Sequence, residues 1–258
     1  MREMMILPRV NRQVFLQVSA VILFILAWEF GCRLFKVPFY LIPVPSTIAV
    51  RFYESTLDLT LLRHSWITIS EVVLGFCSGA IVGFVIGMIF AEFETLRVTM
   101  NPFIVATQVT PKTALAPLFI IWFGFGIASK VFIVALIAFF PVLVNTISGF
   151  HSVDAEKVEL MRSYGANRFK IIRFVKLPAA FPNIFAGLEV ASVMSVLGAI
   201  IGEFVGSKEG LGRLILVGGE RLDLGLVFSS ILVLLIIGFG LKILGDFLQK
   251  RLFFWVGR

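Results

Sequence analysis

Six apolar runs, each long enough to cross a lipid bilayer, constrain this chain more than any other feature of its sequence. A transmembrane helix needs about 20 predominantly apolar residues in succession. We therefore expect an all-α, polytopic membrane protein with six transmembrane helices in a single transmembrane domain over residues 1–258. The runs lie at 14–35, 66–91, 100–123, 131–150, 180–205 and 225–248.

The composition agrees with a lipid environment. Apolar residues of the AVILMFWYC set make up 59% of the chain and charged residues only 15%, whereas about 25% charged residues is usual in soluble proteins. A soluble fold of this length would need more polar residues to cover its surface. Cys32 and Cys77 lie in apolar stretches and His64 and His151 are isolated, so we expect no disulfide framework, metal site or catalytic cluster.

The net charge of +7 can reflect binding to nucleic acid, binding to an acidic partner, or the placement of basic residues on one side of a membrane. With the N-terminus placed in the cytoplasm, fourteen of the 23 Lys and Arg residues lie on the cytoplasmic side and eight on the outer side. Cytoplasmic loops of membrane proteins are enriched in Lys and Arg. We therefore expect both termini in the cytoplasm, and the charge requires no nucleic-acid partner.

Residues 151–179 are the most charged stretch of the chain, and we call them the charged loop. Ser152 is expected to cap a first helix, and Gly165 to end it in the left-handed conformation. A basic second stretch follows, and Pro178 and Pro182 are expected to start the next span. The loop either only sets topology or docks a cytoplasmic partner. The apolar residues of its first helix share one side at helical spacing: Val153, Leu160, Met161 and Tyr164.

The charged loop resembles the EAA loop of bacterial ABC importer permeases, whose pattern is EAA, three residues, G, nine residues, I, one residue and LP. Glu159, Leu160 and Met161 occupy the EAA positions, and Gly165 follows after three residues. Nine residues then separate Gly165 from Val175, which stands for the isoleucine, before Leu177 and Pro178. The anchor residues match the pattern better than the residues between them.

Four further stretches are similar to permeases of the nitrate, sulfonate and taurine importer group, and they cover most of residues 40–215. They read LIPVPSTIAV, GFCSGAIVGFVIGMIFA, PKTALAPLFIIWFGFG and EFVGSKEGLGRLI. The resemblance implies a type I ABC importer fold in the bacterial inner membrane. It also implies ATP-driven uptake of a small solute by alternating access.

In the family that the loop resembles, the loop forms a coupling helix that docks in a cleft of the ATPase subunit. The implied partners are two ATPase subunits, a periplasmic substrate-binding protein and a second copy of this chain, all in contact with the lipid bilayer. By position, the implied ATPase-coupling residues are Ala155, Glu156, Glu159, Arg162, Gly165 and Pro178.

No GxxxxGK[ST] phosphate-binding loop occurs in the chain, and no glycine is followed by lysine. We therefore expect no enzyme activity and no cofactor in this chain, with ATP and Mg bound by the partner ATPase. The resemblance implies nitrate, an alkanesulfonate, taurine or a pyrimidine-like vitamin precursor as the solute. An ATP-independent secondary transporter and an integral-membrane enzyme are the alternatives, although an enzyme would need clustered catalytic residues.

Polar residues within the spans are candidates for the translocation path. A lysine at mid-span costs about 2.5 to 3.5 kcal/mol on insertion scales, so Lys112 should face the bundle interior, a partner or water. Alternatively these groups only pair with one another, for example Lys112 with a glutamate, and Lys242 with Asp246 within one helix. The path candidates are Gln108, Thr110, Lys112, Asn145, Glu189 and Ser192.

Two local patterns predict further structure. Gly75, Gly79, Gly83 and Gly87 recur every four residues in the second span, which favours a face for close helix packing rather than a ligand site. In the outer loop after the first span, Ser46 is expected to cap a short helix over 47–57.

Overall fold

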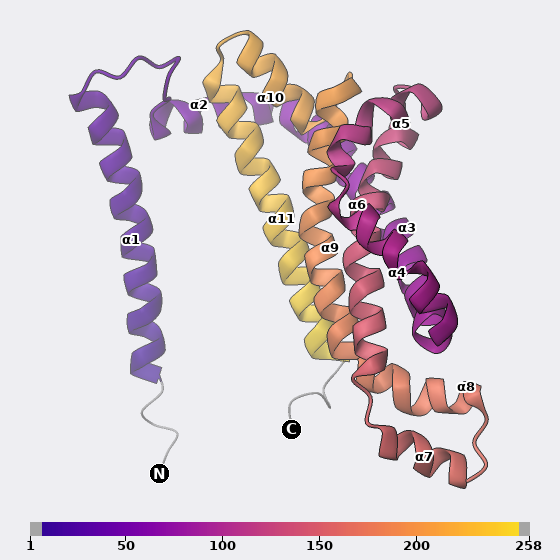
Figure 1. Ribbon diagram of the computed structural model, residues 1–258. Helices are drawn as coiled ribbons and strands as arrows, with labels where there is room; N and C mark the ends of the chain where they lie inside the picture. Colours follow the sequence, from indigo (N-terminus) through magenta and orange to yellow (C-terminus); the bar gives the residue numbers. More distant parts are fainter. Residues whose placement is uncertain (1–6, 253–258) are drawn as a thin grey trace. The chain divides into compact units, whose positions relative to one another are not determined.

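The computed structural model describes residues 7–252, which fold into α-helices and contain no strand (Figure 1). The all-α expectation is confirmed. A 3-10 turn over Lys112–Leu115 and a π turn over Ile172–Lys176 lie between helices. The helices are α1 (Leu7–Leu34), α2 (Pro45–Leu57), α3 (Thr60–Glu92), α4 (Glu94–Val109), α5 (Ala116–Phe123), α6 (Ile127–His151), α7 (Ala155–Ser163), α8 (Arg168–Ile171), α9 (Leu177–Gly206), α10 (Leu211–Glu220) and α11 (Leu224–Leu252).

Five helices of the described chain are long and apolar enough to cross a membrane. They include α1, α3, α6 and α11. The fifth is a continuous helix over Arg168–Gly206, formed by α8, the π turn and α9. α9 begins at Leu177 with Pro178 in its first turn, as expected, but the continuous span starts earlier, at Arg168, and Pro182 lies inside α9. Pro178 lies in the first turn of α9, where its missing N–H costs least, and the π turn absorbs the irregularity before it.

The expected span at 100–123 is not one straight helix. α4 and the segment Lys112–Phe123 meet at an angle of 82°. Thr110 precedes Pro111 and adopts an extended conformation (φ −67°, ψ 128°), because the proline ring disfavours helical geometry in the residue before it. Counting this bent pair as one span gives six, the number expected from the sequence.

The contacts divide the chain into two compact units. One holds α1, α2 and residues 214–231, and the other holds residues 62–213 and 232 onward. In the first unit, Arg51 of α2 forms an ion pair with Asp223 at 2.8 Å.

The N-terminus of α2 differs from the sequence expectation. Val44 rather than Ser46 is its N-cap residue, because Pro45 already occupies the first turn. The backbone N–H of Ser46 donates instead to the carboxylate of Glu29 on α1 at 3.0 Å. A side chain from another helix thus replaces the local cap.

Glycine faces bring two helices of the larger unit against α6. A Cβ built on Gly79 of α3 would lie 2.3 Å from the carbonyl oxygen of Ala135, and one on Gly83 would lie 2.6 Å from that of Phe139. On α9, a Cβ on Gly187 would lie 2.9 Å from the carbonyl oxygen of Pro141. The expected packing face on α3 is confirmed, and α6 is the helix against which α3 and α9 both pack.

We predict that Gly79→Ala destabilises the permease by about 1 to 3 kcal/mol, the usual cost of overpacking, because the new methyl group meets backbone that cannot rotate away. Thermal unfolding of the purified protein in detergent measures the loss. Gly240→Ala on α11 is the matched control, since no described residue lies within 4 Å of its added Cβ. Equal unfolding temperatures for both variants would contradict the packing interpretation.

Candidate functional site

The first helix of the charged loop, α7, is capped at its N-terminus by Asp154. The Asp154 carboxylate accepts a hydrogen bond from the N–H of Glu156 at 3.0 Å. Ser152 does not cap this helix, contrary to the sequence expectation, because α6 continues to His151. The Ser152 hydroxyl instead donates to the carbonyl of Gly149 at 2.9 Å.

Gly165 ends α7 as expected. It has φ +75°, its N–H donates to the carbonyl of Arg162 at 2.9 Å, and the N–H of Ala166 donates to the carbonyl of Met161 at 3.0 Å. This pair of bonds is the Schellman motif, which requires a left-handed residue at this position. Nothing lies within 4 Å of a Cβ built on Gly165, so backbone conformation rather than space constrains the residue.

Large apolar side chains of the charged loop project away from the rest of the protein. Leu160 is 57% exposed and Tyr164 is 81% exposed, and Phe169 and Phe174 on the following segment are also exposed. The predicted coupling residues Ala155, Glu156, Glu159 and Arg162 are exposed on α7, and Pro178 is half-buried at the start of α9. The loop therefore presents a short, rigid helix with an uncovered apolar edge.

A polar cavity of about 360 Å³ lies beneath α7. Its charged residues include Glu92, the last residue of α3, whose carboxylate forms ion pairs with Arg168 and Lys176. Sequence reasoning missed Glu92, because nothing local in the sequence links the end of an apolar helix to a loop 76 residues later. The lining residues are Glu92, Val158, Arg162, Ala166, Arg168, Ile171 and Lys176.

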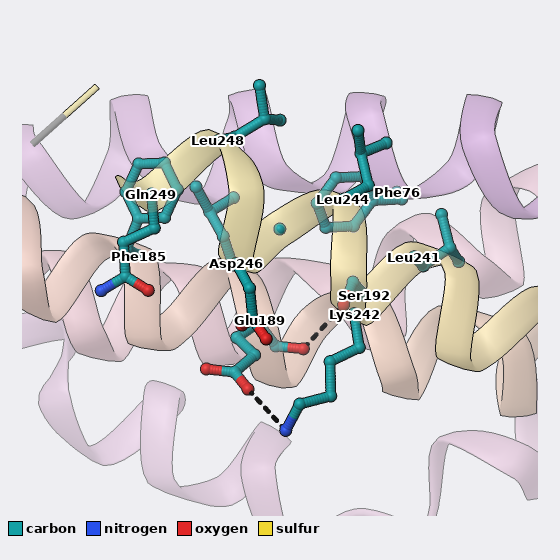
Figure 2. A pocket seen from close by; sticks show the side chains of 12 residues that line it. Phe76, Phe185, Glu189, Ser192, Leu241, Lys242, Leu244, Asp246, Leu248 and Gln249 are labelled. Atoms are coloured by element: carbon teal, nitrogen blue, oxygen red, sulfur yellow. Dashed lines mark hydrogen bonds and ion pairs between the residues drawn. The ribbon is translucent and has the colours of Figure 1, made fainter. Parts of the chain in front are cut away.

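The path candidates predicted from the sequence lie in two different places. Gln108, Lys112 and Asn145 line one cavity of about 630 Å³ between the bent segment, α6 and α9. Glu189 and Ser192 line a separate, smaller cavity of about 170 Å³, which α11 also lines (Figure 2). The hydroxyl of Thr110 donates to the carbonyl of Ala106 at 2.8 Å, and Thr110 lines neither cavity.

Lys112 has no carboxylate partner among the described residues, so its suggested pairing with a glutamate is wrong. Its ammonium donates to the carbonyl of Gln108 at 3.2 Å and lies 4.6 Å from the centre of the Phe140 ring. Neither contact neutralises the positive charge of the Lys112 ammonium, and Lys112 lines the larger cavity.

Lys242 pairs with Glu189 of α9 at 3.2 Å, as Figure 2 shows, and not with Asp246 as expected. A basic residue four positions before an acidic one is the weaker orientation for a pair within a helix. Glu189 lies on the helix beside it and offers the better partner.

A second set of polar residues is buried where α3, α6 and α9 approach the loop after α9. The carboxylate of Glu203 accepts hydrogen bonds from the hydroxyl of Thr68 at 2.6 Å and from the N–H of Gly212. Glu71 and Lys130 are also buried in this region. A Cβ on Gly210 would lie 2.2 Å from the Glu203 carboxyl carbon. This network was not predicted from the sequence, although Gly210 and Gly212, which approach Glu203 closely, were a signal that could have indicated it.

The curated relatives of this chain are permeases. The chain is 34% identical over 233 residues to the riboflavin transport system permease protein RibX of Chloroflexus aurantiacus, covering 90% of this chain and 87% of that protein. It is 28% identical over 252 residues to the taurine transport system permease protein TauC of Escherichia coli, covering 96% and 92%.

The fold matches a solved importer. Inward-facing structures of the MetNI methionine ABC transporter include a chain that superposes with a TM-score of 0.67 at 17% identity, covering 76% of this chain and 97% of that one. A family model described as binding-protein-dependent transport system inner membrane component matches residues 81–256. The chain therefore belongs to this family, as the EAA-like loop indicated, and is a transmembrane permease of the ABC importer type.

Proposed function

We propose that two copies of this chain form the membrane channel of an importer, with an ATPase subunit docked on the charged loop of each copy. The observation that carries this proposal is the uncovered apolar edge of α7, a nine-residue helix held by a cap at each end. So short a helix is marginal alone. Its caps and exposed Leu160 and Tyr164 suit a rigid element that enters a cleft on another subunit.

The residues in contact with the ATPase would be those on and around α7. Glu159 and Arg162 supply exposed charges, and Gly165 supplies the turn that sets the direction of the helix. Ala155 and Glu156 lie in its first turn, and Pro178 lies where the loop enters α9. ATP and Mg bind to the ATPase subunit, because this chain has no phosphate-binding loop.

Import proceeds by alternating access. ATP-driven closure of the two ATPase subunits moves the α7 helices together, and this rigid-body change opens the path outward to receive solute from a periplasmic binding protein. The charged loop and both termini then lie in the cytoplasm, an orientation supported by the excess of Lys and Arg on that side. Of the basic residues counted there, Arg2 and Arg258 lie outside the described residues.

The translocation path would run through the larger cavity, lined by Gln108, Lys112 and Asn145. Because the Lys112 ammonium faces the cavity without a carboxylate partner in the described chain, it favours a small solute that carries an anionic group. The sulfonate of taurine, the solute named for TauC, is such a group. Thr110, Glu189 and Ser192 do not line this cavity, and their role in the path stays a prediction.

A photo-reactive amino acid at Glu159 tests the docking proposal. It should crosslink to the co-expressed ATPase subunit, whereas the same group at Tyr53, exposed on α2, should not. Solute uptake into vesicles that contain this chain but no ATPase subunit would instead favour a secondary transporter.

We predict that Gly165→Val weakens ATPase docking and uncouples hydrolysis from uptake, while Gly165→Asn stays close to wild type. A β-branched residue at φ +75° costs about 1 to 3 kcal/mol, whereas asparagine tolerates this conformation. Co-purification of the ATPase and the rate of ATP hydrolysis by the complex measure the effect. Because no side chain crowds the site, equal behaviour of the two variants would refute the role of the turn.

We also predict that Lys112→Met lowers taurine uptake about tenfold or more, equivalent to roughly 1.4 kcal/mol, while Lys112→Arg retains most of it. Proteoliposomes that hold the permease, its ATPase and its binding protein provide the measurement, with membrane levels as the control for folding. Undiminished uptake by the methionine variant would remove Lys112 from the path.

A further inference from the structure

One carboxylate fastens the end of α3 to the base of the charged loop. Glu92 is the last residue of α3, yet only 7% of its side chain is exposed. Its Oε2 accepts a hydrogen bond from Nε of Arg168 at 3.0 Å, and its Oε1 accepts one from the ammonium of Lys176. Arg168 also donates to the backbone carbonyl of Glu92. Charge-assisted bonds of this kind are the stronger class of hydrogen bond.

The two cations lie at opposite ends of the segment that joins the turn after α7 to α9. Arg168 is the first residue of α8, and Lys176 is the last residue of the π turn. The Arg168 guanidinium also stacks 4.4 Å from the centre of the Phe93 ring, which adds a cation–π contact. Glu92 therefore holds both ends of this segment against the end of α3, and Phe93, the next residue, adds a contact at the Arg168 end.

The connection continues from the loop into the membrane helices. α7 contacts α8 and the π turn, and the glycine face of α3 packs directly on the backbone of α6. Closely packed helices of this kind move as rigid bodies rather than deform. A displacement of α7 thus has a direct mechanical route to α3 through one buried carboxylate.

We infer that Glu92 is a positioning residue that transmits the movement of α7 to α3 during transport. This inference rests on the proposed role of α7 in ATPase coupling and adds the residue that carries the motion onward. Removing its charge would leave two neighbouring cations without their shared partner. Only the carboxylate of this group is buried, at 7% exposed against 53% for Arg168 and 21% for Lys176, so its loss weakens the attachment of the segment to α3 while the Arg168 bond to the Glu92 backbone carbonyl remains.

Glu94 provides a matched control at the same helix junction. Its side chain is 64% exposed, and it pairs with Arg97 three residues later and with His151 at 3.7 Å. Exposed pairs of this kind contribute little. Glu94→Gln therefore removes an acidic residue from the junction without detaching the charged loop.

The test uses the complete complex of permease and ATPase subunits in lipid nanodiscs, with Cys32 and Cys77 replaced by serine. ATP, Mg²⁺ and vanadate provide the trigger. A nitroxide label at Lys157→Cys reports on α7, and in a separate sample a label at Leu62→Cys reports on the far end of α3. Electron paramagnetic resonance then measures the distance between the same label on the two copies.

The trigger should shift both distances in the parent complex and in Glu94→Gln. In Glu92→Gln the α7 distance should still shift while the α3 shift is reduced, because only the packing of α3 on α6 then remains, and Glu92→Asp, which keeps the charge, should recover part of it. A purely structural role for Glu92 would lower the unfolding temperature and leave the α3 shift intact, which would overturn the inference.

Two further outcomes keep the inference separable from the proposed function. If Glu92→Gln does not assemble, the double variant Arg168→Gln and Lys176→Gln removes the same ion pairs from the loop side, together with the Arg168 contacts to the Glu92 carbonyl and the Phe93 ring, and an intact α3 shift in it overturns the inference. A parent complex in which α7 itself does not respond would contradict the coupling role of α7. An α7 that responds together with an unchanged α3 shift in Glu92→Gln would contradict the role of Glu92 alone.

Discussion

The larger unit of this permease depends on the direct contact of helix backbones at α6. In lipid there is no hydrophobic effect to drive one helix against another, so association relies on close packing. Gly79 and Gly83 allow α3 to reach the carbonyl oxygens of α6, and Gly187 allows α9 to do the same. α6 is thus held closely on two sides. The cavity and the charged loop take their positions from this arrangement.

The regular features of the fold followed from sequence because they depend on local chemistry. Apolar run length predicted the helices, the four-residue glycine spacing predicted the face of α3 that packs on α6, and Gly165 predicted the end of α7. The spacing from Glu159 to Pro178 indicated the family, which the comparison with known permeases confirms. Each of these signals lies within a short stretch of chain.

The features that sequence did not predict depend on distant residues meeting in space. Run length cannot distinguish a straight span from one bent by 82° at Thr110 and Pro111. The spacing within one helix predicted that Lys242 pairs with Asp246, but Lys242 forms its ion pair with Glu189 on a neighbouring helix. Glu92 carried no signal at all, since its partners follow 76 and 84 residues later. For the same reason, only three of the six predicted path residues, Gln108, Lys112 and Asn145, line one cavity.

The hydrogen bonds of Glu203 bear on the order in which the chain enters the membrane. A carboxylate in an apolar helix is costly until its acceptors are satisfied. Among the donors to Glu203, Thr68 belongs to a helix made much earlier, and Gly212 follows only nine residues later. Both groups have therefore been synthesised once the chain extends nine residues beyond Glu203, because α3 precedes α9 in the sequence. Synthesis from the N-terminus thus supplies Thr68 before the buried carboxyl group and Gly212 directly after it.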